Sequence, residues 1–274
     1  MIKSNFTKRE KNGVIYYTIP SFDRTKLVKH LFSTRIKGFS KPPFDSLNLG
    51  INREDSIDAV RKNYEIICKL LDISIDSIAF SNQVHGTDIR IVDKSHTAKK
   101  ISFNKNNEEG IDGLITDERG ITLCTFYADC VPLYFLDPVK KVIGLAHAGW
   151  RGTAGKIAAK ITDKMIDLYN CLPKDILVGI GPSIGPCCYE VGENVFKTFN
   201  ENFTKLEKLL ISKGDNKWYL NLWEANMLIL KGRGILQKNI IISKLCTSCN
   251  NDKFYSYRKE DGETGRMAAV IQLL

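Results

Sequence analysis

The stretch ADCVPLYFLDPVKKVIGLAHAGW, residues 128–150, decides the fold. Its two apolar runs, 131–136 and 141–147, lie on either side of Asp137-Pro138, a dipeptide that is typical of turns. The stretch therefore predicts a β-hairpin. Because Cys130 comes just before the first strand and His147 ends the second, the hairpin would bring both side chains to the same end of the sheet.

Further runs of strand length occur along the whole chain. They cover residues 14–19, 27–33, 78–85, 88–92, 113–116, 121–126, 176–180, 240–244 and 268–273. Gly86-Thr87 separates the third run from the fourth and predicts a turn there. The polar stretch 95–110 predicts a surface loop.

Helical spacing of apolar residues predicts three helices, over 56–72 with Ser56 as N-cap, over 153–169 and over 222–230. Strands and helices mix without strict alternation. We therefore expect an α/β or mixed α+β fold, a layered mixed β-sheet sandwich flanked by helices. With no repeat or long linker, we expect a single domain over residues 1–274.

The composition is that of an ordinary globular protein, with 43% hydrophobic and 26% charged residues. The net charge of +9 comes from scattered lysines, which does not favour nucleic-acid binding, while anionic small substrates fit it. No run reaches the ~18 apolar residues of a spanning helix, and the first twelve residues contain no signal-peptide core. We expect no membrane contact and a cytoplasmic location. The eight cysteines are then free thiols or metal ligands.

A metal site is the first functional hypothesis. The chain has four histidines, and two of them, His85 and His147, end strand-like runs. Together with Cys130 they offer two imidazoles and one thiolate, which suit Zn²⁺ and leave a coordination position open for catalysis. Spacing alone favours the alternative that these are core or loop residues and a buried thiol, since no short motif such as H-E-x-x-H is present.

Several longer motifs follow one another from about residue 31 to the end of the chain. They are STR at 33–35, LNLG at 47–50, NQVHG at 82–86, DGLIT at 112–116, ADCVP at 128–132, AHAGWRGT at 146–153, GPSI at 181–184, CCYEV at 187–191, CTSC at 246–249, FYSYR at 254–258 and TGR at 264–266. In this order they resemble the laccase-domain (YfiH-like) family, whose members were once called polyphenol oxidases.

The resemblance implies a zinc-dependent purine nucleoside phosphorylase with accompanying adenosine deaminase activity. Expected substrates are phosphate with adenosine, inosine, guanosine or methylthioadenosine. The resemblance also implies that His85, Cys130 and His147 hold the metal. The chain departs from the family after the STR motif, where Lys37 interrupts the glycine pair before Gly38.

Phosphorolysis needs an anion site near the metal. Arg151, Gly152 and Thr153 follow the His147 strand and open the predicted helix, whose N-terminus would attract phosphate. The alternative is that Thr153 is only an N-cap and Arg151 a surface charge. Further candidates are Arg35, Arg258 and Arg266 for phosphate and Asn48 for the sugar or base.

Rival functions use the same residues. Deamination lacks the glutamate of the known zinc nucleobase deaminases, which leaves Asp129 as proton carrier or as a buried structural carboxylate. A metal-independent cysteine hydrolase would use Cys130 and His147. Copper is the alternative metal, but four histidines cannot build the trinuclear cluster of a copper-dependent polyphenol oxidase. A non-enzymatic metal-binding or partner-binding module is the last alternative.

The remaining cysteines offer a weaker pattern. Cys246 and Cys249 form a C-x-x-C motif, which is half a zinc site or a redox pair. No second C-x-x-C exists, so we expect free thiols here and at Cys187-Cys188. The oligomeric state is not predicted.

Overall fold

The structure is a computed structural model that describes residues 4–51, 54–97 and 110–274. In this part of the chain the strands form three sheets. The first has the order β1 (Thr7–Lys11), β2 (Val14–Thr18), β3 (Val28–Ser33), β15 (Met267–Leu273), β7 (Thr122–Tyr127), β4 (Ile78–Phe80). The second has the order β14 (Ile240–Ile242), β10 (Leu177–Ile180), β8 (Val131–Asp137), β9 (Val142–Ala148), β6 (Gly113–Thr116), β5 (Ile89–Ile91). The third is small, with β11 (Glu190–Val191), β13 (Lys217–Leu220) and β12 (Leu210–Gly214).

The two large sheets pack face to face. Their inner faces share one apolar core, with Phe32 and Leu123 from the first sheet and Tyr134 and Leu145 from the second. The Tyr134 hydroxyl also donates a 2.8 Å hydrogen bond to the Leu31 carbonyl across this core. Burial of apolar side chains between the sheets, at roughly 25 cal/mol per Å², is the main stabilising contribution.

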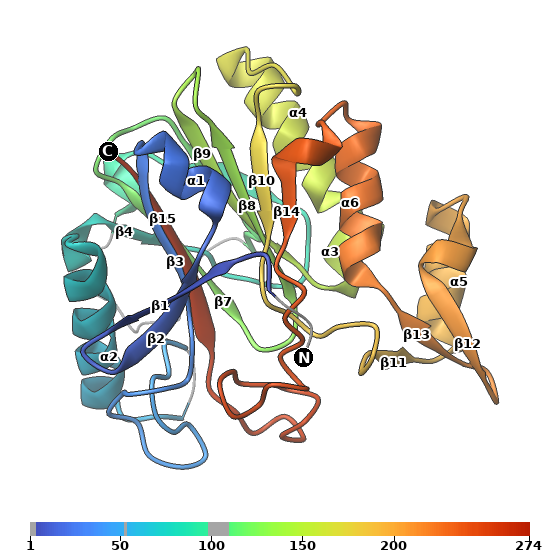
Figure 1. Cartoon of the computed structure of the whole chain (residues 1–274), viewed down its shortest axis with the longest axis horizontal. Coiled ribbons are helices and arrows are strands. Elements are labelled where there is room, and N and C mark those ends of the chain that lie inside the picture. The colour runs from blue at the N-terminus through green and yellow to red at the C-terminus, as the bar shows by residue number, and fades with distance from the viewer. Residues whose placement is uncertain (1–3, 52–53, 98–109) are drawn as a thin grey trace.

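Helices cover the outer faces (Figure 1). α2 (Ile57–Leu71) packs on the first sheet, while α4 (Ile157–Tyr169) and α6 (Leu222–Gly232) pack on the second. The expected layered mixed sandwich flanked by helices is thereby confirmed. The helices predicted over 56–72 and 222–230 are confirmed as well, and the Ser56 side chain caps α2 by accepting from the Ala59 N–H.

The decisive hairpin is also confirmed. β8 and β9 are antiparallel neighbours in which Val131 lies opposite Ala148 and Pro132 opposite His147. At the turn, the Asp137 carboxylate accepts the N–H groups of Val139 and Lys140 at 2.8 and 2.9 Å. An Asp side chain that bonds to the backbone in this way stabilises the turn.

The strand and turn predicted over 78–92 are wrong in part. β4 ends at Phe80 and pairs with β7 of the first sheet, whereas β5 pairs with β6 of the second. The segment between them therefore crosses from one sheet to the other. The backbone N–H groups of Val84, His85 and Gly86 bond to the side chain of Asp112 and are not available for a strand ladder.

The helix predicted over 153–169 is two helices, α3 (Trp150–Ala154) and α4. Lys156 lies between them with a left-handed φ of 62°, which ends one helix and redirects the chain into the next. Gly149 is the N-cap of α3, so Thr153 is an interior residue of that helix.

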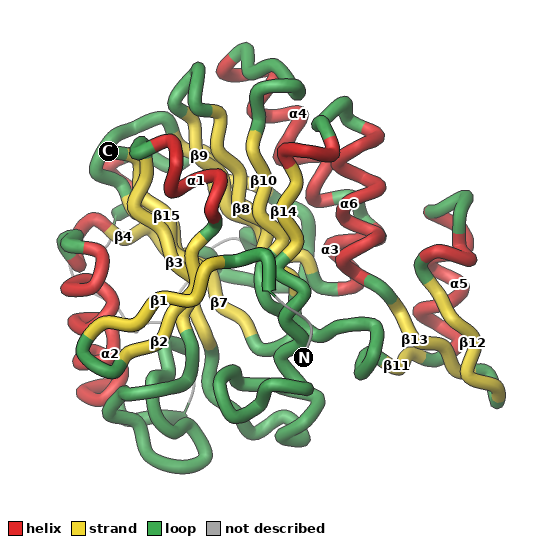
Figure 2. The backbone as a smooth tube through the Cα atoms, viewed as in Figure 1, coloured by secondary structure: helices red, strands yellow, loops and turns green. Residues whose placement is uncertain are grey.

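Several elements carry no clear signal in the sequence. They are α1 (Pro20–Thr25), α5 (Glu193–Asn202), β1, β11 to β13, and the single 3₁₀ turns η1 (Ile75–Ser77), η2 (Lys94–His96), η3 (Leu206–Lys208) and η4 (Gln237–Asn239). Residues 98–109 of the predicted surface loop lie outside the described residues. Figure 2 shows long loops below the first sheet, where β3 ends and β15 begins. Among the described residues, no helix has the length and apolar character needed to cross a membrane.

Candidate metal centre and active site

Three potential metal ligands meet at the ends of β8 and β9. One ligand atom from each of His85, Cys130 and His147 lies within 4.8 Å of the other two. The hairpin supplies Cys130 and His147, and the crossing segment after β4 supplies His85. The two imidazole rings lie edge to face, with centroids 4.9 Å apart.

Asp112 holds two of these ligands in place. Its carboxylate, which is fully buried, lies 2.7 Å from Nδ1 of His147 and accepts the backbone N–H groups of Val84, His85 and Gly86 at 2.8–3.1 Å. Because Nδ1 is engaged, Nε2 of His147 is the nitrogen that faces Cys130. A carboxylate behind a histidine in this way is the usual outer-shell partner in zinc proteins.

Two backbone features let the ligands converge. His85 has a left-handed φ of 63°, which the three N–H bonds to Asp112 hold in place. A Cβ on Gly149 would lie 3.1 Å from both the Cys130 sulfur and Cδ2 of His85. A side chain at position 149 would therefore crowd Cys130 and His85, which favours glycine there.

The electrostatics of the centre favour a thiolate. Burial raises the pKa of Cys130, but the neighbouring His147 and His85 outweigh it and bring this pKa down to about 6. Burial lowers the pKa of His147, yet Cys130 and Asp112 raise it to about 9. The pKa of Asp112 lies below its ordinary value because hydrogen bonds from His147 and the backbone outweigh its burial.

The donor set fits a divalent metal. Two imidazole nitrogens and a thiolate are ligands that zinc and copper both accept. Metal binding would displace the proton that the Cys130–His147 pair shares. Because His85 is exposed, the fourth coordination position of a metal held by these three residues would be open toward solvent.

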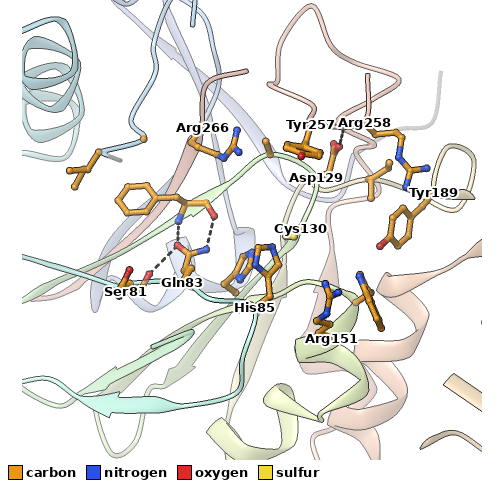
Figure 3. A pocket seen from close by; sticks show the side chains of 18 residues that line it. Ser81, Gln83, His85, Asp129, Cys130, Arg151, Tyr189, Tyr257, Arg258 and Arg266 are labelled. Atoms are coloured by element: carbon orange, nitrogen blue, oxygen red, sulfur yellow. Dashed lines mark hydrogen bonds between the residues drawn. The ribbon is translucent and has the colours of Figure 1, made fainter. Parts of the chain in front are cut away.

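A cavity of about 650 Å³ lies over the three ligands. Three arginines line it, Arg151, Arg258 and Arg266, and Figure 3 shows them around His85 and Cys130. Each guanidinium lies over an aromatic ring: Arg151 is 4.3 Å from the ring of Trp150, Arg258 is 5.3 Å from Tyr189, and Arg266 is 5.8 Å from Tyr257. All three aromatic residues also line the cavity. The cavity is therefore lined by three potential metal ligands, three arginines and three aromatic rings.

The three arginines differ in what else they contact. Among the described residues no hydrogen bond or ion pair involves the side chain of Arg151. Arg258 donates to the Glu190 carbonyl at 2.9 Å, and Arg266 donates to the carbonyls of Thr264 and Gly265. Among the described residues none of the three forms an ion pair with a carboxylate, although the charge of Arg258 acts on the nearby Asp129.

Arg35 and Asn48 are not among the residues that line this cavity. Arg35 forms a 2.8 Å ion pair with Glu260 and lies over the ring of Tyr255. Asn48 is fully buried, and its oxygen accepts the N–H groups of Gly50 and Arg266 at 3.0 and 2.8 Å. In this structure Arg35 orders the loops behind the site, and Asn48 positions two residues that line the cavity.

Asp129 lies beside Cys130 with both carboxylate oxygens engaged. The Thr247 hydroxyl donates to one at 2.6 Å, and the Arg258 backbone N–H donates to the other at 2.7 Å. Burial raises the pKa of Asp129. These bonds favour a structural role for Asp129 over the alternative role of proton carrier.

Asp112 is the functional residue that the sequence analysis missed. Asp112 is the first residue of the DGLIT motif and lies just before β6. A carboxylate next to a fully buried strand was the sequence feature that could have indicated its role. Arg258 and Arg266, which were weaker candidates on sequence grounds, are brought to the cavity by the fold.

The sequence of the chain is similar to proteins of one known family. Residues 29–274 match the sequence profile of a family described as multi-copper polyphenol oxidoreductase laccase. The chain is 39% identical to purine nucleoside phosphorylase YlmD of Geobacillus stearothermophilus over 240 residues, which cover 87% of this chain and 88% of that protein. It is 34% identical to purine nucleoside phosphorylase YlmD of Bacillus subtilis, with 88% and 86% of the two chains covered.

The fold also matches a solved structure. The crystal structure of the hypothetical protein YfiH of Bacillus licheniformis superposes with a TM-score of 0.92 at 34% sequence identity. The match covers 97% of this chain and 99% of that chain. The arrangement of sheets that creates the cavity is therefore shared with that protein.

Proposed function

Because the chain belongs to the laccase-domain (YfiH-like) family, we propose that it is a zinc-dependent purine nucleoside phosphorylase. It would convert adenosine, inosine, guanosine or methylthioadenosine and phosphate to the free base and the sugar 1-phosphate. One observation carries the proposal: a single cavity contains both a convergent His–Cys–His ligand set and three arginines that form no ion pair with a carboxylate of the described residues. Such a cavity suits a cation and a phosphate at short range.

His85, Cys130 and His147 would hold the metal. When bound there, zinc supplies Lewis acidity that withdraws electron density from a substrate atom. The chain contributes the orientation: Asp112 fixes His147 with its Nε2 toward the metal position and fixes the backbone of His85. Rigid ligands of this kind reduce the cost of organising the site for each turnover.

The arginines would bind and orient phosphate. Guanidinium groups match phosphate oxygens in charge and geometry, and water exclusion strengthens such hydrogen bonds. The rings of Trp150, Tyr189 and Tyr257 hold the three guanidinium groups over their faces and so limit their motion. The same aromatic walls offer stacking surfaces for a purine. Phosphate held beside the sugar would attack the anomeric carbon as the base departs.

A second candidate function rests on one specific contact. Asp112, His147 and Cys130 follow one another as carboxylate, imidazole and thiol, which is also the order of a cysteine-hydrolase triad. That function would leave His85 without a role, although it lies within reach of both His147 and Cys130. The phosphorylase assignment accounts for all three residues.

A copper polyphenol oxidase is less well supported. The two other histidines are engaged elsewhere: Nε2 of His30 accepts the N–H of Ile19, and Nδ1 of His96 contacts Asp93. The chain has four histidines in all, so it cannot add a histidine-rich trinuclear cluster to the site.

The direct test is release of adenine from adenosine, with and without phosphate, by zinc-loaded wild type and by Cys130→Ala. We expect release that requires phosphate and that disappears in the variant. Formation of inosine in the same samples would reveal the accompanying deaminase activity. Absence of base release from every purine nucleoside tested, with zinc bound at the His–Cys–His centre, would refute the substrate assignment. Rapid alkylation of Cys130 with no zinc uptake would instead favour the cysteine hydrolase.

A further inference from the structure

Four cysteines outside the active site come together from two distant loops. Cys187 and Cys188 lie between β10 and β11, and Cys246 and Cys249 lie between β14 and β15. β10 and β14 are parallel neighbours, visible side by side in Figure 1, so both loops leave the sheet at the same end. We name these four residues the four-cysteine cluster.

The backbones of the two loops are fastened to each other. Ser183 and Cys246 form a parallel bridge, in which the Ser183 N–H donates to the Leu245 carbonyl at 3.2 Å and the Thr247 N–H donates to the Ser183 carbonyl at 3.0 Å. The Trp223 indole N–H donates to the Ser183 hydroxyl at 2.6 Å and ties the bridge to α6. The cysteines are therefore held on a supported framework.

The sulfur positions match those of a tetrahedral site. All four Sγ atoms lie within 4.8 Å of one another, and Cys249 Sγ is 3.4 Å from both Cys187 Sγ and Cys188 Sγ. Zn–S bonds of about 2.3 Å in a tetrahedron place the sulfurs about 3.8 Å apart. Four cysteines complete the coordination of zinc and leave no open position, as in structural zinc sites.

A hydrogen bond from the backbone to one of the sulfurs also fits a zinc site. The backbone N–H of Gly185 donates to Cys246 Sγ at 3.2 Å. A Cβ at this position would lie 2.8 Å from the Trp223 ring and 3.2 Å from Cys187 Sγ, so glycine lets the backbone approach the sulfurs. Hydrogen bonds from backbone N–H groups stabilise the negative charge of metal-bound thiolates.

We propose that Cys187, Cys188, Cys246 and Cys249 bind a second zinc ion whose role is structural. Disulfides do not explain the arrangement, because Cys249 is equally close to two sulfurs and a disulfide joins only one. An iron–sulfur cluster would need more space, since its cysteines bind separate irons around an inorganic core. Exposure of Cys187 and Cys249 gives a metal access to the cluster.

This zinc would stabilise one wall of the active site. Ile184 and Tyr189, which line the cavity, flank the Cys187-Cys188 pair in the chain. The Ile184 N–H donates to the Asp129 carbonyl at 2.9 Å, and the Thr247 hydroxyl donates to the Asp129 carboxylate. The cluster is thus linked through Asp129 to Cys130, the thiol at the floor of the cavity.

Metal content tests the proposal. The full chain is purified under reducing conditions, loaded with zinc, dialysed and analysed by elemental mass spectrometry. We expect two zinc ions per chain in wild type and in the control Cys68→Ser, whose thiol is buried where α2 packs on the first sheet. We expect one in Cys130→Ala, one in Cys249→Ser and none in the double variant.

A spectroscopic measurement covers the case in which Cys249→Ser does not fold. Cobalt in the four-cysteine cluster of wild type gives intense thiolate-to-metal absorption with tetrahedral visible bands, and Cys130→Ala retains them. One zinc per chain in wild type and none in Cys130→Ala would overturn the proposal. Iron with acid-labile sulfide, or native disulfides among the four residues by mass, would overturn it as well. None of these outcomes depends on the phosphorylase assay.

Discussion

Two clusters with thiol groups lie at the ends of strands of the second sheet, and they differ in their ligands and surroundings. The His85–Cys130–His147 centre has three mixed ligands, an outer-shell carboxylate and a cavity above it. The four-cysteine cluster has four identical ligands from two loops, and none of them lines that cavity. A protein site that keeps one coordination position open can do chemistry, whereas a site that fills all four can only stabilise. In our proposal, the count and kind of ligands would therefore separate a catalytic centre from a structural one within a single fold.

Cys130→Ala and Cys249→Ser should differ most in their effects on activity. The first should lower phosphorylase activity more than about 100-fold, because loss of an outer-shell partner alone typically costs 10–100-fold. The second should lower kcat/KM less than about tenfold, which corresponds to roughly 1.4 kcal/mol, while it lowers the thermal unfolding midpoint. Equal loss of activity in both variants, with both proteins folded, would contradict the division of roles.

Asp112→Asn should produce the next largest effect. The amide replaces an acceptor oxygen that receives backbone N–H groups and the imidazole of His147. We expect zinc affinity or activity to fall about 10–100-fold, measured by competition with a chromogenic chelator and by base release. Asp117→Asn, at an exposed position just after β6, is the matched control. Unchanged zinc affinity and activity in Asp112→Asn would remove this residue from the site.

Arg151→Met tests the anion-binding wall alone. Loss of a charge-assisted hydrogen bond, worth about 1.5–3 kcal/mol, should raise KM for phosphate about tenfold or more. KM for the nucleoside and the zinc content should stay close to wild type. Arg119→Met, an exposed arginine outside the cavity, serves as control. A rise in the nucleoside KM with an unchanged phosphate KM would reassign Arg151 to the nucleoside.

The last prediction concerns the stability of the fold and a histidine outside both clusters. Burial lowers the pKa of His30 to about 4, although the nearby Asp23 acts to raise it. The unfolded chain therefore takes up a proton near pH 6.5 while the folded chain does not, so stability falls as the pH decreases from about 6.5 toward 4. Between pH 7 and 5 wild type should lose about 2 kcal/mol more than His30→Gln. Urea unfolding at both pH values measures this, and parallel losses in the two proteins would count against a neutral buried His30.

The sequence predicted those parts of the fold that depend on local chemistry. The β8–β9 hairpin follows from the Asp137 turn and two apolar runs, and it places Cys130 beside His147. The strand predicted over 78–85 ends early because the N–H groups of residues 84–86 bond to Asp112, a residue that only tertiary structure brings near. Local pattern alone cannot reveal such a partner.

The free thiols expected at Cys187, Cys188, Cys246 and Cys249 are free cysteines in the structure. What the C-x-x-C motif at 246–249 did not predict is that these four residues cluster, since no second C-x-x-C exists in the sequence. The partners of this motif are the adjacent Cys187 and Cys188, which approach only because β10 and β14 are parallel neighbours. Arg258 and Arg266 reach the cavity in the same manner, from the long loop before β15. Long-range strand pairing, which no spacing rule encodes, assembled both features.

We propose that the sugar of a purine nucleoside is transferred to phosphate in the cavity above His85, Cys130 and His147. Phosphorus NMR of zinc-loaded protein with adenosine and inorganic phosphate tests it most directly, since it observes the product that distinguishes phosphorolysis from hydrolysis. The account predicts that ribose 1-phosphate appears in step with free adenine and that Cys130→Ala forms neither. Free adenine without any ribose 1-phosphate, or no adenine at all from protein with zinc bound at the centre, would contradict it.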